Sequence, residues 1–243
     1  MKPAMIQIGN FFFRYRNRVF PLIVITLFAL AAPPPKLFGS TKLEHLKDFL
    51  ALGIALTGLG IRSLVIGYAY IKRGGLNKTV YAERIVTGGM FGVCRNPLYL
   101  GNLLVCVGVF LIHGNVWVML LGIGIYLFIY QCIVLAEEDY LIRKFGAEYL
   151  TYFHTVPRWM PKFSNWGRAT QGMRFNLRRA LVKDYATIAL TIIILAMTEG
   201  YEELAYFSPF HKWYFAFLVA VILVSIVTTG LLRILKKRKS LIA

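Results

Sequence analysis

The segment from residue 96 to residue 136 runs for 41 residues without an aspartate, glutamate, lysine or arginine. One membrane-spanning helix needs only about 20 mostly apolar residues, so this segment has the length of two spans. His113-Gly114-Asn115 near its centre is a turn signal. We therefore predict a tight helical hairpin over residues 97–136.

Other stretches of the chain have the same character. Of all residues 58% are hydrophobic and 16% are charged, whereas charged residues make up about 25% of an ordinary soluble domain. The further apolar segments are 19–35, 49–71 (interrupted only by Arg62), 185–198 and 213–232. The sequence thus predicts an all-α, multi-pass integral membrane protein with about six transmembrane helices.

The basic residues are distributed unevenly between the two predicted sides of the membrane. With the N-terminus inside, 23 of the 28 lysines and arginines fall on the cytoplasmic side and four on the other. This asymmetry is the positive-inside pattern, so we predict that both termini are cytoplasmic. The net charge of +17 then reflects topology and attraction to anionic membrane lipids.

Two function classes are disfavoured by composition. No basic surface with interleaved aromatic residues is separate from the membrane flanks, so nucleic acid is not an expected partner. The three cysteines are odd in number and widely spaced, which speaks against a disulfide framework or a metal site. They are Cys94, Cys106 and Cys132.

Three parts of the chain are distinguished. Residues 1–71 hold two predicted membrane helices, 72–184 form a core with the hairpin and its cytoplasmic extensions, and 185–243 add two more membrane helices. The basic start followed by an apolar run and Ala29-Leu30-Ala31 also resembles a cleavable signal peptide. The sequence leaves open whether the first helix is retained or removed as a signal peptide.

The hairpin begins with "CRNPLYLG", residues 94–101. Asn is a favoured N-cap and Pro is tolerated at the first helical position, so we expect a helix to start near Pro97. A helix N-terminus attracts anions, and Arg95 adds a guanidinium that suits a carboxylate or phosphate. The alternative is a helix cap beside a topology-setting arginine, with no ligand.

The hairpin ends in the acidic run Glu137-Glu138-Asp139. Antiparallel helices place residues 97 and 137 at the same level, so we expect the acidic run to face the predicted anion site. Such a pair would suit a zwitterion with an additional positive charge. Asp139 and Arg143 have the spacing of an ordinary helical ion pair, which is the alternative reading. Arg62 is a further candidate because charged side chains within a span are costly.

These residues together match a family pattern. "RIVTGGMFGVCRNPLYLGNLL", followed about forty residues later by "EEDYLIRKFGAEYLTYFHTVPRWMP", resembles the integral-membrane methyltransferases related to isoprenylcysteine carboxyl methyltransferase and phospholipid methyltransferase. The matching positions lie within residues 84–161. They are Val86, Gly89, Phe91, Arg95, Pro97, Tyr99 and Gly101, then Glu137, Glu138, Leu141, Phe145, Gly146, Tyr149 and Tyr152.

The resemblance implies an enzyme that uses S-adenosyl-L-methionine at the cytoplasmic face. It assigns cofactor binding to Gly89, Arg95, Asn96, Pro97, Tyr99, Gly101, Glu137, Glu138 and Tyr149. It assigns the acceptor to Arg62, Arg143 and Tyr152, with Arg143 and Glu137 as the catalytic residues. The implied acceptor is a lipophilic molecule or a lipidated substrate from the bilayer, and the resemblance leaves its methylated group and the oligomeric state open.

The chain departs from the family pattern at Asn96, where a histidine is usual. Asn can hydrogen-bond but cannot carry charge or transfer a proton near neutral pH, which argues against a base at this position. Two other function classes stay open: an NADPH-dependent reductase resembling the sterol reductases, and a non-enzymatic membrane transport protein. The concentration of polar residues at one cytoplasmic face argues against the transport protein, and the Glu pair that soon follows "RNPLYLG", without a further basic cluster for a 2'-phosphate, argues against the reductase.

Overall fold

The structure is a computed structural model that describes residues 1–69, 79–206 and 211–237. The regular secondary structure over these ranges is helical, and an isolated bridge joins Leu37 and Ser40. The α-helices are α1 (Lys2–Leu30), α2 (Thr41–Tyr68), α3 (Pro97–His113), α4 (Val116–Phe145), α5 (Ala147–Thr155), α6 (Trp166–Thr170), α7 (Leu177–Tyr206) and α8 (Lys212–Lys237), with two short 3-10 helices, η1 (Gly89–Gly92) and η2 (Phe163–Asn165). Residues 72–78 of the expected cytoplasmic loop lie outside the described residues.

Four of these helices, α2, α4, α7 and α8, are long and apolar enough to cross a membrane. The apolar helix α3 is shorter, with 17 residues. The expected all-α membrane architecture is therefore confirmed, with four candidate spans among the described residues; the count of six stays a prediction. The basic residues Arg14, Arg16 and Arg18 lie inside α1 itself, and only residues 19–30 of the expected apolar span 19–35 are helical, as the second part of this longer helix.

The predicted hairpin is present. Helix α3 ends at His113, Gly114 adopts a left-handed conformation with φ of 74°, and α4 begins at Val116. The Asn115 side chain caps α4 by accepting hydrogen bonds from the backbone N–H groups of Trp117 (3.1 Å) and Val118 (3.3 Å). These are the bonds expected of an Asn N-cap, so the turn chemistry read from the sequence is confirmed.

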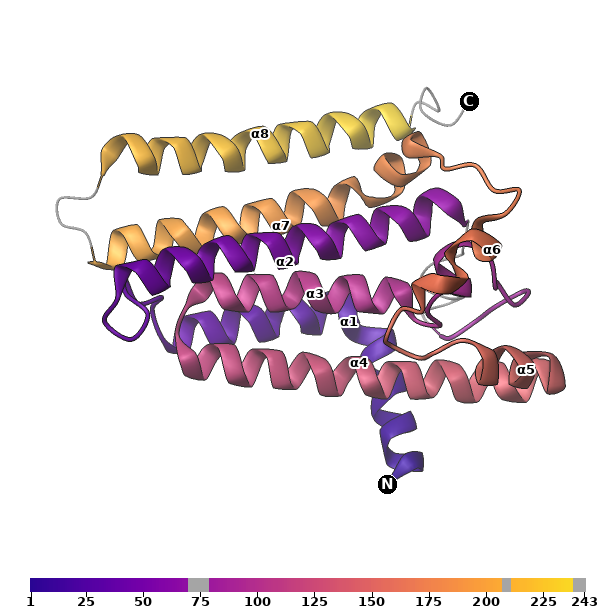
Figure 1. The fold of residues 1–243 in the computed structure, drawn as a ribbon. Helices are drawn as coiled ribbons and strands as arrows, with labels where there is room; N and C mark the ends of the chain where they lie inside the picture. The colour runs from indigo at the N-terminus through magenta and orange to yellow at the C-terminus, as the bar shows by residue number, and fades with distance from the viewer. Residues whose placement is uncertain (70–78, 207–210, 238–243) are drawn as a thin grey trace.

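The long helices form an elongated bundle. Helix α2 packs mainly on α3, α1 on α4, and α7 on α8, while α7 also contacts α2 and α3. Figure 1 shows that the end of α2, the start of α3, the end of α4 and the start of α7 gather at one end of the bundle, together with α5 and α6. These segments, all expected to be cytoplasmic, therefore share one end, whereas the N-terminal part of α1 projects below α4 in Figure 1; the side of the membrane on which this end lies stays a prediction.

Small residues set the closest helix contacts. A Cβ atom added to Gly58 of α2 would lie 2.6 Å from the carbonyl oxygen of Gly101 in α3, and one added to Gly9 of α1 would lie 2.0 Å from that of Cys132 in α4. Lipid tails are as apolar as the helix surfaces, so close backbone packing is a main source of helix association in a bilayer.

Two segments at this end of the bundle have clear helix boundaries. Gly146, with φ of 53°, separates α4 from α5. The basic residues of 177–183 form the first part of the long helix α7.

The α2–α3 contact predicts the effect of one added methyl group. We expect Gly58→Ala to lower the free energy of unfolding by about 1–3 kcal/mol, since the new Cβ would overlap backbone atoms of α3. The matched control is Gly53→Ala in the same helix, where a Cβ would meet nothing within 4 Å. Thermal unfolding in detergent would measure both. Equal midpoints for the two variants would contradict the close packing.

Candidate functional site

Helix α3 starts at Pro97, as predicted, with Asn96 as the preceding residue. The Asn96 carbonyl accepts the backbone N–H of Leu100 at 2.9 Å, but its side chain makes no capping bond. Instead the amide nitrogen donates to the carbonyl oxygen of Arg158 at 3.3 Å. The expectation that Asn96 caps the helix through its side chain is therefore wrong, and this side chain ties the helix start to the segment after α5.

Arg95 is buried at this helix start and is fully engaged. Its Nε and Nη2 atoms lie 3.2 and 3.1 Å from Oε1 of Glu138. Nη1 donates to the carbonyl oxygens of Phe153 and Val156, the latter at 3.0 Å, and the guanidinium lies 4.0 Å from the centre of the Phe153 ring. All three guanidinium nitrogens therefore have partners within the protein.

Glu138 joins a second arginine to the first. Oε2 of Glu138 accepts Nη2 of Arg158 at 2.7 Å, and Oε1 accepts Nε of Arg158 at 3.1 Å. The Glu138 side chain is 5% exposed and that of Arg158 is 30% exposed. We call Arg95, Glu138 and Arg158 the Glu138 cluster. It holds one buried carboxylate between two guanidiniums, the arrangement in which a buried charge is tolerated.

The neighbouring Glu137 has a different environment. Its Oε1 accepts the hydroxyl of Tyr99 at 2.7 Å, and Arg16 of α1 lies near enough to interact electrostatically with it. The Tyr99 ring in turn lies 5.6 Å from that of Tyr130. Successive residues of a helix point about 100° apart, so the two glutamates serve two separate sets of partners.

The expected juxtaposition of the two ends of the hairpin is thus present, with one difference. Arg95 and Tyr99 at the start of α3 contact Glu138 and Glu137 at the end of α4. However, Arg95 is neutralised by Glu138, so the two charged groups pair with each other and do not form separate anion and cation sites.

Helix α5 covers this region with aromatic side chains. Tyr149 and Tyr152 are buried with Val156 in a small apolar cluster, and the Tyr152 hydroxyl donates to the carbonyl oxygen of Phe91 at 2.7 Å. Burial raises the pKa of both tyrosines above the usual value near 10. Their hydroxyls therefore stay protonated near neutral pH and serve as hydrogen-bonding groups.

Cys94, next to the cluster, is not suited to nucleophilic chemistry. Its Sγ donates to the carbonyl oxygens of Arg158 and Trp159, each at 3.3 Å. Burial raises the pKa of the thiol to about 11, so the thiolate is scarce at neutral pH. All three cysteines are free, and the described residues contain no group of side chains that could hold a metal ion.

Three predicted acceptor residues lie in different surroundings. Arg143 forms an ion pair with Asp139 at 2.7 Å, and its side chain is 72% exposed; this is the ordinary helical pair. Arg62 is buried and donates to Asp184 and Thr187 of α7 and to Asn102 of α3. The structure does not bring Arg62 into contact with the Glu138 cluster, whereas Tyr152 lies beside it on α5.

The two predicted cofactor glycines have packing roles. A Cβ at Gly101 would lie 2.7 Å from Cγ of Arg62, and one at Gly89 would lie 3.0 Å from Cβ of Tyr68. Gly89 also has φ of 62°, which favours glycine. At both glycines the missing side chain makes room for neighbouring protein atoms, so each glycine is explained by packing within the protein.

Sequence reasoning missed several partners of the site residues. Arg158 stands in the quoted "VPRWMP" but has no spacing relation to Glu138 that would single it out. Asp184, which pairs with Arg62, sits within a basic stretch. The available signal for Asp184 was that a buried Arg62 requires an anionic partner, and the described spans contain few acids.

The comparisons with known proteins agree with this architecture. Residues 49–148 match the family model of the phospholipid methyltransferases. This part of the chain is therefore similar to the phospholipid methyltransferases. The match confirms the resemblance to isoprenylcysteine carboxyl methyltransferase-like membrane enzymes and supports a membrane methyltransferase. No curated protein and no solved structure gave a match. The matched residues run from within α2 to Glu148 in the first turn of α5, so they include both glutamates and Arg95 but not Arg158.

The Glu138 cluster predicts unequal roles for the acidic residues. We expect Glu138→Ala to lower the free energy of unfolding by about 3–5 kcal/mol, because it leaves the buried Arg95 without a counter-charge. Asp139→Ala, the adjacent control, breaks only the exposed pair with Arg143 and should cost less than about 1 kcal/mol. Thermal unfolding in detergent measures both. A Glu138→Ala protein as stable as Asp139→Ala would refute the structural role of the cluster.

Proposed function

We propose that the chain transfers a methyl group from S-adenosyl-L-methionine to a lipophilic acceptor at the cytoplasmic face of a membrane. The observation that carries the proposal is the meeting of Tyr99–Glu137 and the Glu138 cluster at one end of the α3–α4 hairpin, within a segment that matches a membrane methyltransferase family. The uncharged length of the hairpin supports a site at a membrane boundary.

The residues present fit the charges of this cofactor. S-adenosyl-L-methionine carries a sulfonium, an ammonium and a carboxylate. Glu137, which accepts a hydrogen bond from the neutral hydroxyl of Tyr99, supplies negative charge for a cation, and the Tyr99 and Tyr130 rings supply aromatic faces. The partly exposed guanidinium of Arg158 supplies a planar group for the carboxylate.

Arg95, Asn96 and Pro97 contribute to binding the carboxylate of the cofactor. The three nitrogens of Arg95 are occupied, so it acts by holding Glu138 and, through it, the guanidinium of Arg158. Asn96 fixes the Arg158 backbone, and Pro97 begins the helix whose N-terminus favours an anion. Tyr149, buried beneath the cluster, lines the site from α5.

When bound, S-adenosyl-L-methionine would supply a methyl group activated by its sulfonium for transfer to a lone pair of the acceptor, with S-adenosylhomocysteine as the leaving group. The protein has to align donor and acceptor within about 3–3.5 Å and keep water out. An anionic acceptor needs no base, and the exposed Arg143 is placed to steer one. With an ammonium acceptor, Glu137 would be the group that accepts the proton.

Ligand binding tests this proposal directly. We expect the purified protein to bind S-adenosylhomocysteine in calorimetry, and Glu137→Gln to weaken binding about tenfold or more, because a charge-assisted contact to the ligand ammonium is lost. Asp139→Asn, one helix position beyond Glu138 and paired with Arg143, is the control and should bind like the parent protein.

The outcomes separate the competing functions. Binding of NADPH with no binding of S-adenosylhomocysteine would favour a reductase and overturn the proposal. Binding that is equally strong in Glu137→Gln would keep the methyltransferase but remove Glu137 from the cofactor site. Incubating membranes with methyl-labelled donor would then identify the acceptor.

A further inference from the structure

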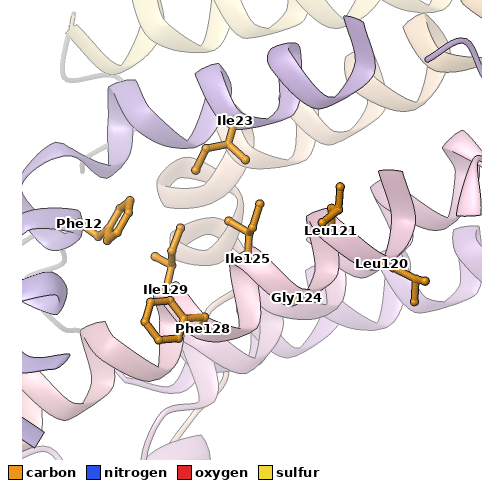
Figure 2. A pocket seen from close by; sticks show the side chains of 8 residues that line it. All are labelled: Phe12, Ile23, Leu120, Leu121, Gly124, Ile125, Phe128 and Ile129. Carbon is orange, nitrogen blue, oxygen red and sulfur yellow. The ribbon is translucent and has the colours of Figure 1, made fainter. Parts of the chain in front are cut away.

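An open apolar groove runs along the outside of the bundle between α1 and α4. Phe12 and Ile23 of α1 face Leu120, Gly124, Ile125 and Phe128 of α4 across it, as Figure 2 shows. On α4 the lining extends from Leu120 to Ile129, a length of about 13 Å at 1.5 Å per residue. No charged side chain takes part in the lining.

The groove lies at the depth of the hydrocarbon layer. Helix α4 is one of the four candidate spans, and the groove occupies its uncharged middle. The walls are exposed, with Leu120 at 62% and Phe128 at 49%. Within a bilayer the molecules available to cover such a surface are lipids, so a flexible hydrocarbon chain fits the groove by chemistry and by place.

One end of the groove leads toward the candidate site. Gly9 of α1, one turn before Phe12, packs directly on Cys132 and Ala136 of α4. Ala136 immediately precedes Glu137, and Ile129 lies about 12 Å from Glu137 along the helix. Along α4, the groove is therefore followed first by the contact with Gly9 of α1 and then by Glu137, the partner of Tyr99.

Three arginines of α1, Arg14, Arg16 and Arg18, lie between the groove-lining residues Phe12 and Ile23. Arg16 is one helical turn from Phe12 and interacts electrostatically with Glu137 and with Tyr99. Arg14 and Arg18 flank it and are exposed. Guanidinium groups beside an apolar groove are complementary to a molecule that joins a phosphate to a long alkyl chain.

We propose that the groove seats one acyl chain of a phospholipid acceptor, whose phosphate lies at the arginines of α1 and whose head group reaches Glu137. The proposal rests on the methyl transfer proposed above and adds to it a location for the acceptor. It also gives a function to α1, which lies outside the family-matched residues 49–148.

Gly124 makes the proposal testable, because a Cβ added there would meet nothing within 4 Å. Gly124→Phe should fill the groove without displacing protein atoms. Gly60→Phe is the matched control, since Gly60 is also a helical glycine of a candidate span with open space around its Cβ, but it lies on α2, away from the groove.

The experiment uses the full chain in phosphatidylcholine vesicles that contain a phosphatidylethanolamine with a diazirine in its acyl chain. After irradiation without methyl donor, we expect the label to concentrate on peptides from α4 and α1 that line the groove. Gly124→Phe should reduce this labelling about tenfold, corresponding to the loss of specific binding, and Gly60→Phe should leave it unchanged. Under turnover, Gly124→Phe should raise KM for the lipid while S-adenosylhomocysteine affinity stays the same.

Two results would overturn the proposal. If the parent protein is labelled evenly over the exposed faces of α2, α4 and α8, the lipid makes only ordinary contact with the membrane-facing surface. This result is obtained without any variant. Unchanged labelling and KM in Gly124→Phe would mean that the groove is not the acceptor seat. Since the labelling is done without donor and donor binding is measured separately, failure of S-adenosylhomocysteine binding would count against the methyltransferase proposal and not against lipid binding in the groove.

Discussion

The tight turn between α3 and α4 determines where the polar residues of this molecule meet. Gly114 and Asn115 leave almost no loop, so the two helices start level at that end and differ only in length. Helix α3 has 17 residues, whereas α4 reaches Glu138 after 23, which extends α4 about 9 Å beyond the start of its partner. Glu138 therefore reaches Arg95, two residues before the helix begins, and not a residue within it. The Tyr99 side chain leans back toward the start of α3, as long side chains on helices do, and so reaches Glu137.

The two adjacent glutamates that the hairpin brings to the start of α3 have different partners and can therefore have different roles. Glu138 is held between two guanidiniums, and the removal of its charge would leave buried positive charge without compensation. Glu137 has a neutral hydroxyl as its hydrogen-bond partner and keeps more capacity to interact with a cation. A rigid charged cluster next to a less committed carboxylate is a suitable arrangement for a binding site, because the cluster fixes the geometry while its neighbour meets the ligand.

The parts of this structure that could be predicted depend on local chemistry. The hairpin turn, the start of α3 at Pro97 and the juxtaposition of the two hairpin ends follow from Gly, Asn and Pro preferences and from the uncharged length between them. The partners of the charged residues could not be predicted, since Arg158 and Glu138 are 20 residues apart and Arg62 and Asp184 are 122 apart. A glycine in the sequence indicates that another group comes close to the backbone, but it does not identify that group. At Gly101 the group is the neighbouring helix α2. Gly146 was visible as a motif residue, yet only its positive φ shows that it ends α4.

The pair of Arg62 and Asp184 shows how the helices outside the matched segment join it. Apolar contact alone gives little preference for a neighbouring helix over lipid, because both surfaces are equally apolar. A charged side chain within a span, however, is stable only opposite its partner. Arg62 of α2 donates to Asp184 and Thr187 of α7 and to Asn102 of α3. The hydrogen bonds of this guanidinium therefore depend on the relative position of the three helices. Helix α7 is thereby fixed against the core by a polar contact, and α8, which packs on α7, follows it. The buried arginine that the sequence marked as a substrate residue thus has a sufficient explanation in holding α7 to the hairpin.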